Sequence, residues 1–386
     1  MAGRLRARRS NSCAPPERVR QAALDLIQLG DDRDIQFAAR RFEQRGARSQ
    51  CRVGNDFHGV GKINPETGLP LEIAGRSWTD EFSDELCDLG EQRSDIVALT
   101  AAMMIPVGLK PFAQRHPDRV FDVGIAEQHA VTMASGLAFG GMHPVVTIYA
   151  TFLNRAFDQV LMDCALHRAG VTFVLDRAGV TGSDGPSHNG MWDMSILGVV
   201  PGLRLAAPRD GQRVRDALRE AVQVEDGPTV LRIPKGSASD RVDAVGRSGS
   251  LDVLHEAPAE SVDLLVVAVG AMAGTALTVA EKLESQGLSV RVVDPRWVLP
   301  VHADLVEAAR AARAVCVIED NVVTGGVGAA VTAALREAGI PATCHCYGIP
   351  QRFLHHASRD QVLDEIGLTP DAIATSLTQR LAPPAT

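Results

Sequence analysis

Aromatic residues are scarce in this chain of 386 residues: they make up 4% of it, and two of them are tyrosines. Hydrophobic residues at 45% and charged residues at 22% lie close to the globular average. The apolar interior must therefore be built mainly from Ala, Val, Leu and Ile, as is typical of α/β domains. The length predicts two or three such domains and excludes a small disulfide scaffold, and the composition excludes a wholly disordered chain.

Long apolar runs are also missing, since no eighteen consecutive apolar residues occur. This excludes a membrane-spanning helix, and the basic start carries no apolar segment of the kind that a secretory signal needs. We expect a cytoplasmic protein.

Charge is unevenly distributed along the chain. The first fifty residues hold eleven arginines, no lysine and six acids, which is a net charge of +5. Since the whole chain carries −8, the remaining residues carry −13. An acidic body without a basic stripe argues against nucleic-acid binding.

Cysteines are few and scattered: there are seven, and among them Cys344 and Cys346 stand close together. A C-x-C spacing alone is a weak metal signal. Because these two residues alternate within an apolar, strand-like run, we interpret them as reduced thiols of the core, and we expect no metal site in this chain.

Composition and patterning divide the chain into five segments. They are an Arg-rich head at 1–53, expected to be disordered or atypical; a Gly- and Pro-rich connector at 54–76; an α/β domain at 77–240; a linker at 241–262; and a second α/β domain at 263–386.

Within each domain, short apolar runs alternate with longer helical patterns, which indicates parallel sheets covered by helices on both faces. The expected strands are 95–99, 119–123, 144–149, 171–176, 203–206, 229–233, 263–269, 289–293, 314–318 and 342–347. The expected helices are 79–90, 125–139, 154–168, 211–223, 273–286, 303–312 and 327–338.

The carboxyl ends of parallel strands meet at one edge of a sheet, and ligands bind there. In the first domain these ends are rich in side chains able to do chemistry. They are Glu127 after the second strand, Tyr149 and Phe152 after the third, Arg177, Asp184 and His188 after the fourth, and Lys235 after the sixth.

Four features of the sequence have more than one interpretation. Glu127 opens an apolar helix that we expect to be buried, either as a first-turn Glu favoured by the helix dipole or as a carboxylate kept for proton chemistry. His129 is expected in the core or behind the site. Asp184 and His188 either form an acid–imidazole pair or Asp184 is a turn former. The glycines of residues 325–328 indicate either a phosphate cradle or tight helix–strand packing.

Four runs carry a resemblance to a known family: FDVGIAEQHAVTMASGLAFGGMHPVVTIYATFLNRAFDQ, LDRAGVTGSDGPSHNGMWDMSILG, PTVLRIPKG and DPRWVLPV. From about Phe57 onward the chain resembles 1-deoxy-D-xylulose-5-phosphate synthases, thiamine-diphosphate enzymes related to transketolase. The resemblance implies a transketolase pyrimidine-binding domain followed by a transketolase C-terminal domain. It also implies the substrates pyruvate and glyceraldehyde 3-phosphate, whose product feeds isoprenoid, thiamine and pyridoxal synthesis.

The resemblance also implies roles for individual residues. Glu127 matches the glutamate that bonds the aminopyrimidine ring of the cofactor, and Phe152 matches an aromatic residue that stacks on that ring. Tyr149, Arg177, Asp184 and His188 match positions of the substrate pocket, with Arg177 a clamp for the acceptor phosphate. Asp184 and His188 are expected to be catalytic together with Glu127. Lys235 falls where some members have arginine, and His58, in FHGVG, matches a connector histidine.

One expected element is missing from the sequence as given: nothing resembles the family's first domain, whose GDG and Asn motif binds Mg²⁺ and the diphosphate. We therefore expect this chain alone to be inactive. Alternatives are a split enzyme with the first domain on a separate chain, a non-catalytic partner of a full-length synthase, and a mis-started gene product. The family further implies a homodimer.

Overall fold

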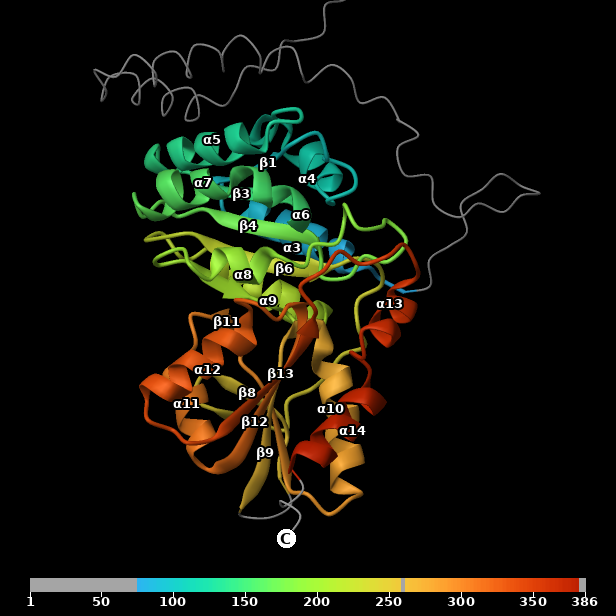
Figure 1. Ribbon diagram of the computed structural model, residues 1–386. Coiled ribbons are helices and arrows are strands. Elements are labelled where there is room, and N and C mark those ends of the chain that lie inside the picture. The colour runs from blue at the N-terminus through green and yellow to red at the C-terminus, as the bar shows by residue number, and fades with distance from the viewer. Residues whose placement is uncertain (1–74, 258–260, 382–386) are drawn as a thin grey trace, which may run out of the picture.

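The protein, seen in a computed structural model that describes residues 75–257 and 261–381, contains two mostly parallel β-sheets, each covered by helices (Figure 1). The predicted fold of two parallel-sheet α/β domains is confirmed, with antiparallel strands added at sheet edges. The predicted head, nearly all of the connector and His58 lie outside the described residues. Among those residues, no helix is both long enough and apolar enough to cross a membrane.

The first sheet has seven strands in the order β11-β5-β6-β4-β3-β1-β2. Every pair is parallel except β11 with β5. Its central strands are almost wholly buried, which explains why they read as continuous apolar runs. The strands are β1 (Ile96–Thr100), β2 (Val120–Asp122), β3 (His143–Tyr149), β4 (Thr172–Ala178), β5 (Arg204–Ala206), β6 (Thr229–Pro234) and β11 (Trp297–Leu299).

Helices cover both faces of this sheet. The first begins at a capping box in which Ser77 and Asp80 satisfy each other's backbone N–H. The α-helices are α3 (Trp78–Gln92), α4 (Lys110–Arg115), α5 (Glu127–Phe139), α6 (Ala150–Leu153), α7 (Phe157–Gln159), α8 (Asp193–Leu197) and α9 (Gly211–Ala221). Short 3₁₀ turns lie at η1 (Pro117–Arg119) and η2 (Asn154–Ala156).

The predicted helix at 154–168 is broken. After α7 the chain forms a π-helix, η3 (Val160–Ala165), packed against α5. Ser135 on α5 donates a hydrogen bond to the backbone carbonyl of Asp163 at 2.7 Å, and Thr132 donates to its carboxylate at 2.5 Å. Ser135 thus takes up a backbone carbonyl that would accept a hydrogen bond within a regular α-helix. Local periodicity does not reveal such a contact between two helices.

The second sheet has six strands in the order β13-β12-β9-β10-β8-β7. They are β7 (Gly246–Ser248), β8 (Leu251–His255), β9 (Val262–Ala268), β10 (Val290–Asp294), β12 (Ala312–Val322) and β13 (Thr343–Ile349). Its helices are η4 (Gly270–Met272), α10 (Ala273–Glu284), α11 (Ala303–Arg310), α12 (Val327–Glu337), α13 (Arg359–Glu365) and α14 (Pro370–Leu381). The segment at 241–262 was expected to be a linker, but in the structure it contains β7 and β8. These strands form there because Leu251, Val253 and Leu254 bury their side chains in the core.

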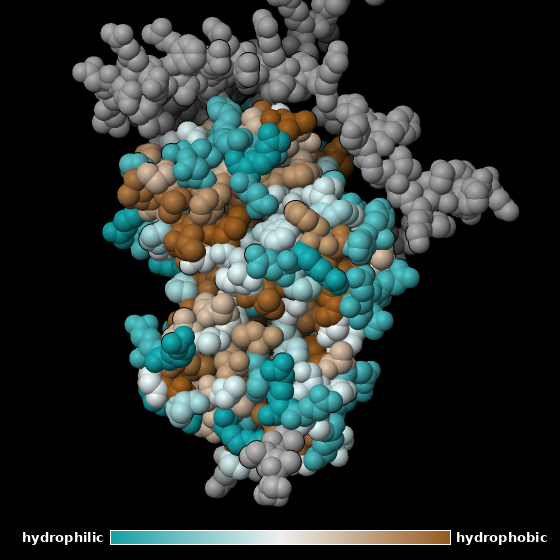
Figure 2. Space-filling view, viewed as in Figure 1, coloured by the Kyte–Doolittle hydropathy of each residue, from teal (hydrophilic) through white to brown (hydrophobic). Residues whose placement is uncertain are grey.

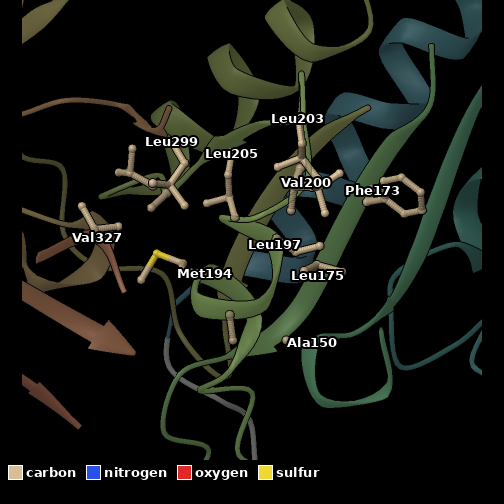
Figure 3. Packing of buried hydrophobic residues seen from close by; sticks show 14 of the residues in the cluster. Ala150, Phe173, Leu175, Met194, Leu197, Val200, Leu203, Leu205, Leu299 and Val327 are labelled. Carbon is tan, nitrogen blue, oxygen red and sulfur yellow. The ribbon is translucent and has the colours of Figure 1, made fainter. Parts of the chain in front are cut away.

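The two sheets are joined by shared packing. β11 comes from the second half of the sequence but pairs with β5 of the first sheet. One hydrophobic cluster runs through both halves, and Figure 3 shows Leu299 and Val327 lying near Met194 and Leu197. The loops at the carboxyl ends of the first sheet are therefore positioned by both halves of the chain.

Candidate active site at the carboxyl edge of the first sheet

Six of the predicted site residues lie together, because β3, β4 and β6 are neighbours and parallel. Their carboxyl ends place the loops that follow side by side. Ring contacts, a cation–π contact and two ion pairs link six side chains into one group: Tyr149, Phe152, Arg177, Asp184, His188 and Lys235.

Asp184 lies between two cations. Arg177 Nη1 donates to one carboxylate oxygen at 3.1 Å, and Lys235 Nζ donates to the other at 2.5 Å. Burial raises the pKa of Asp184, but the hydrogen bond from Lys235 and the charge of Arg177 outweigh it and hold the pKa below its usual value. Two cations facing one carboxylate leave an excess positive charge, which suits an anionic ligand.

The acid–imidazole pair that was one interpretation of Asp184 and His188 is not formed. Instead, His188 Nδ1 lies 2.9 Å from the hydroxyl of Ser187. Asp184 is engaged by the two cations, and that charge pairing is stronger than a hydrogen bond to an imidazole. His188 is left facing the aromatic side chains rather than the acid.

Aromatic rings form one wall of the group. Tyr149 and Phe152 stack at 5.7 Å between centroids, with 18° between their planes. His188 meets Phe152 edge-on at 5.7 Å, and the guanidinium carbon of Arg177 lies 4.2 Å from the Tyr149 ring centroid. Burial raises the pKa of Tyr149 to about 12, so its hydroxyl stays protonated at neutral pH. This wall offers a flat surface beside two cations.

Arg177 is held in an uncommon backbone conformation. Its φ is +59°, the left-handed region that a long side chain rarely adopts. Its N–H donates to the buried Asp176 at 2.6 Å, and the hydroxyl of Thr79 donates to the same carboxylate at 3.1 Å. Burial raises the pKa of Asp176 to about 7. Asp176, which sequence reasoning missed, thus aims Arg177 at the site.

Glu127 begins α5 and is 3% exposed. Within the described residues its Oε2 has no hydrogen-bond partner, and Arg155 Nε stands 3.6 Å from it. A buried carboxylate oxygen without a donor is costly, so this atom fits a ligand that carries an N–H or a ring nitrogen able to share a proton. Glu127 thus lies in the first turn of α5, and its use in proton chemistry stays a prediction.

The loop that carries Asp184 and His188 is anchored by the second half of the chain. Asp320 at the end of β12 accepts a hydrogen bond from Val180 N at 3.1 Å. Arg359 donates to the carbonyl of Val180 at 2.8 Å and pairs with Asp320 at 2.5 Å. Asp320 could have been suspected as an acid at the end of an apolar strand, whereas nothing in the sequence singles out Arg359.

The glycine-rich turn before α12 is filled by a side chain of the protein. Glu319 accepts hydrogen bonds from the backbone N–H groups of Val327 and Gly328 at 2.8 and 2.9 Å. A Cβ on Gly326 would lie 2.4 Å from the same carboxylate. Burial raises the pKa of Glu319 to about 8. The turn therefore serves tight helix–strand packing, because a carboxylate occupies the place that a phosphate would take.

Two sequence expectations are wrong. His129, expected in the core or behind the site, is exposed and so is not a core residue, while its place behind the site stays a prediction. The cysteines on β13 are not both core residues: Cys346 is exposed and Cys344 is half-buried, because β13 lies at the edge of its sheet. Among the described residues, no group of three or more His, Cys, Asp or Glu side chains could hold a metal ion.

Comparison with known families identifies two matches. Residues 74–240 match the family described as "Transketolase, pyrimidine binding domain", and residues 255–373 match "Transketolase, C-terminal domain". The first match covers β1 to β6 of the first sheet, and the second covers β9 to β13.

Curated relatives include two named 1-deoxy-D-xylulose-5-phosphate synthase 2. The protein of Kitasatospora griseola is 60% identical over 86% of this chain and 54% of its own length, and that of Streptomyces coelicolor is 60% identical over 84% and 51%. The chain thus spans about half the length of the curated relatives it matches.

Among solved structures, one titled "Split gene transketolase, inactive beta4 tetramer" matches with a TM-score of 0.69 and 27% identity. The match covers 80% of this chain and 99% of that one. A Pichia stipitis transketolase in complex with sedoheptulose 7-phosphate matches with a TM-score of 0.67 at 16% identity, covering 83% of this chain and 47% of that one, and shows a shared fold.

Proposed function

Because this chain is a transketolase-like protein related to 1-deoxy-D-xylulose-5-phosphate synthases, we propose that it forms one side of a thiamine-diphosphate-dependent active site. That site condenses pyruvate with glyceraldehyde 3-phosphate, releasing CO₂ and 1-deoxy-D-xylulose 5-phosphate. The observation that carries the proposal is the buried carboxylate oxygen of Glu127, which has no hydrogen-bond partner within the described residues.

When bound, thiamine diphosphate supplies carbanion stabilisation for decarboxylation and carbon–carbon bond formation. Glu127 would bind the aminopyrimidine ring and hold a proton between its Oε2 and a ring nitrogen. Phe152, half-buried two strand ends away, would stack on that ring. The shielding of Glu127 from water strengthens this hydrogen bond, because electrostatic interactions gain energy in a low dielectric.

Arg177 and Lys235 would bind the phosphate of the acceptor. In the structure both reach Asp184, so the incoming anion competes with that carboxylate for the two cations. The guanidinium can bind two phosphate oxygens at once, whereas the ammonium acts as a point charge. Tyr149 and His188 would border the same pocket and exclude water from it.

The Mg²⁺ and the diphosphate need ligands that the described residues do not provide, since no suitable cluster of metal-ligating side chains occurs among them. We infer that a further domain supplies them, either in the same protein or on a partner chain. The neighbour titled a split gene transketolase, 99% of which is covered by the match, supports a subunit of this size.

The surface along α5 and η3 supports such an assembly. The helix α5, which its sequence predicts to be buried nearly all round, exposes Phe139 at 52%, and Ile125 just before it is 76% exposed. Leu166, following η3, is 63% exposed, and Met162 within η3 is 45% exposed. Figure 2 shows apolar side chains gathered over α5 and α7. Exposed apolar patches of this kind mark protein interfaces.

Co-expression tests the proposal. The full chain is produced with the part of the Kitasatospora griseola synthase that it does not match, and the purified complex is assayed for product from pyruvate and glyceraldehyde 3-phosphate. We expect synthesis by the complex and none by either chain alone. Glu127→Gln should lower kcat by at least about 100-fold, the scale of a lost acid–base group, while the exposed Glu337→Gln should leave it unchanged.

Two outcomes would count against this function. One is a stable complex that makes no product; the other is a Glu127→Gln complex as active as the unmodified one. A chain that forms no complex with that segment, yet changes the activity of an intact synthase when added to it, would favour the alternative role of a non-catalytic partner.

A further inference from the structure

Two thiols lie side by side on the outer strand of the second sheet, away from the proposed active site. Cys344 and Cys346 are two residues apart on β13, so both side chains point to the same face of the sheet. Their sulfur atoms are 4.0 Å apart. The helix α12 packs on this face and places Thr332 Oγ1 3.8 Å from Cys346 Sγ.

This pair differs from the other described cysteines in its access to solvent. Cys87, Cys164 and Cys316 are buried, and burial raises the pKa of Cys164 to about 12. Cys346, by contrast, is exposed, and β13 has no neighbour on its outer edge among the described strands. Because Cys344 is half-buried, a reagent or ion in solution approaches the pair from the side of Cys346.

The distance between the sulfurs distinguishes two uses of such a pair. A disulfide bond is about 2.05 Å long, so the sulfurs would have to approach by about 2 Å. Residues two apart on an extended strand have Cα atoms about 6.6 to 6.8 Å apart, at the outer limit for disulfides. A disulfide would thus require β13 to distort.

A metal ion fits the same distance without distortion. Metal–sulfur bonds of about 2.3 Å separate two sulfurs by about 3.8 Å at a tetrahedral angle and by about 4.6 Å when linear. The 4.0 Å separation lies within this interval. Because no cluster of three or more metal-ligating side chains occurs among the described residues, a closed tetrahedral zinc site is excluded there.

We propose that Cys344 and Cys346 bind one soft, thiophilic cation of low coordination number, of which Cu(I) is the representative, as a bis-thiolate on the outer edge of the second sheet. Two metal–sulfur bonds form, the two S–H bonds break and release their protons to solvent, and no electron is transferred. Thiolate ligands select Cu(I) over harder ions such as Mg²⁺. The site is independent of the proposed transferase chemistry.

The test is anaerobic titration of the full-length chain with Cu(I) against bicinchoninate, a coloured competitor. Cys13 and Cys51, which lie outside the described residues, are first replaced by Ser so that they do not contribute thiols. We expect one Cu(I) per chain. Cys344→Ser and Cys346→Ser should each weaken Cu(I) binding by more than about 100-fold. Loss of a residue that only supports a ligand costs at most about that much, so a larger effect identifies a direct ligand. Cys87→Ser, a buried cysteine, should not.

Native mass spectrometry of the same proteins gives a second readout, and thermal melting checks that every variant is folded. No retention of Cu(I) by the folded chain would overturn the proposal, as would equal retention by Cys346→Ser. So would a chain that retains no Cu(I) but loses two hydrogen masses on peptide 343–349 with oxidised glutathione, because the pair would then be a redox disulfide.

Discussion

Arg209 donates a hydrogen bond through Nη1 to Asp294 at 2.6 Å, and both side chains are about 1% exposed. The same guanidinium nitrogen reaches Asp252 at 2.7 Å. Arg209 lies just before α9, which belongs to the first α/β unit, while the two acids lie on β10 and β8 of the second sheet. This buried cluster therefore fastens the two halves together.

Removing the arginine should destabilise the protein strongly. Arg209→Met leaves the buried carboxylate of Asp294 without its cation, while Asp252 keeps Arg213 at 2.9 Å. The loss of one partner from a buried ion pair costs about 3 to 5 kcal/mol of unfolding free energy. Urea denaturation measures it. The control is Arg241→Met, which breaks an exposed pair with Asp243 and should cost no more than about 1 kcal/mol. Equal losses for the two variants would show that Arg209 does not couple the halves.

The buried Asp176 predicts a pH dependence. Its folded pKa is about 7, above the ordinary value of 3.8, so its contribution to stability is full below about pH 4 and is lost as the pH rises through 7. A shift of that size corresponds to at most about 4 kcal/mol. Asp176→Asn should remove this loss while keeping a hydrogen-bonding side chain beside Thr79.

Denaturation at pH 5 and pH 8 checks this prediction. The difference in unfolding free energy between the two pH values should shrink in Asp176→Asn and stay unchanged in Asp243→Asn, whose side chain is exposed. The same pH difference in Asp176→Asn as in the unmodified protein would show that Asp176 ionises freely.

The clamp assigned to Arg177 predicts a selective change in kinetics for the co-expressed complex. Arg177→Met should raise the KM for glyceraldehyde 3-phosphate by about 10- to 100-fold, as expected for the loss of a charged hydrogen bond. The KM for pyruvate, which has no phosphate, should change little. Steady-state kinetics with each substrate varied gives both values, and Arg204→Met, on the far end of the first sheet, is the control. An equal rise for both substrates would contradict a phosphate clamp.

The apolar face along α5 and η3 predicts where a second chain binds. Phe139→Asp and Leu166→Asp should each prevent copurification of the segment from the relative, because each places a charge in a buried apolar contact. Val245→Asp is the matched control, since Val245 is 69% exposed but lies in the second half of the chain. Retained association in both variants, measured by size exclusion, would exclude this face as the interface.

Local patterning was sufficient for most of the fold. The strand expected at 144–149 is β3, and the helix expected at 273–286 is α10, because a buried strand or an amphipathic helix shows its period within one short segment. β11 escaped detection, since its three residues are held as a strand only by β5, far away in the sequence.

The site shows the same division. The order of strands and loops was enough to predict that Tyr149, Arg177, Asp184 and Lys235 would approach one another, since parallel neighbours end at a common edge. The partners of these residues were not predictable: Asp184 binds two cations rather than His188, and Arg359 reaches the same loop across 179 residues of sequence.

The amino-acid sequence by itself determined the two α/β halves, their helices and strands, and the motifs that place this chain among its relatives, because these depend on periodicity and residue type. Tertiary structure alone decided which charges are buried, which faces stay open and how far apart two sulfurs lie. Burial, pairing and distance arise between segments remote in sequence, so the open oxygen of Glu127, the buried contacts of Arg209 and the exposed Cys346 became visible only in the folded chain.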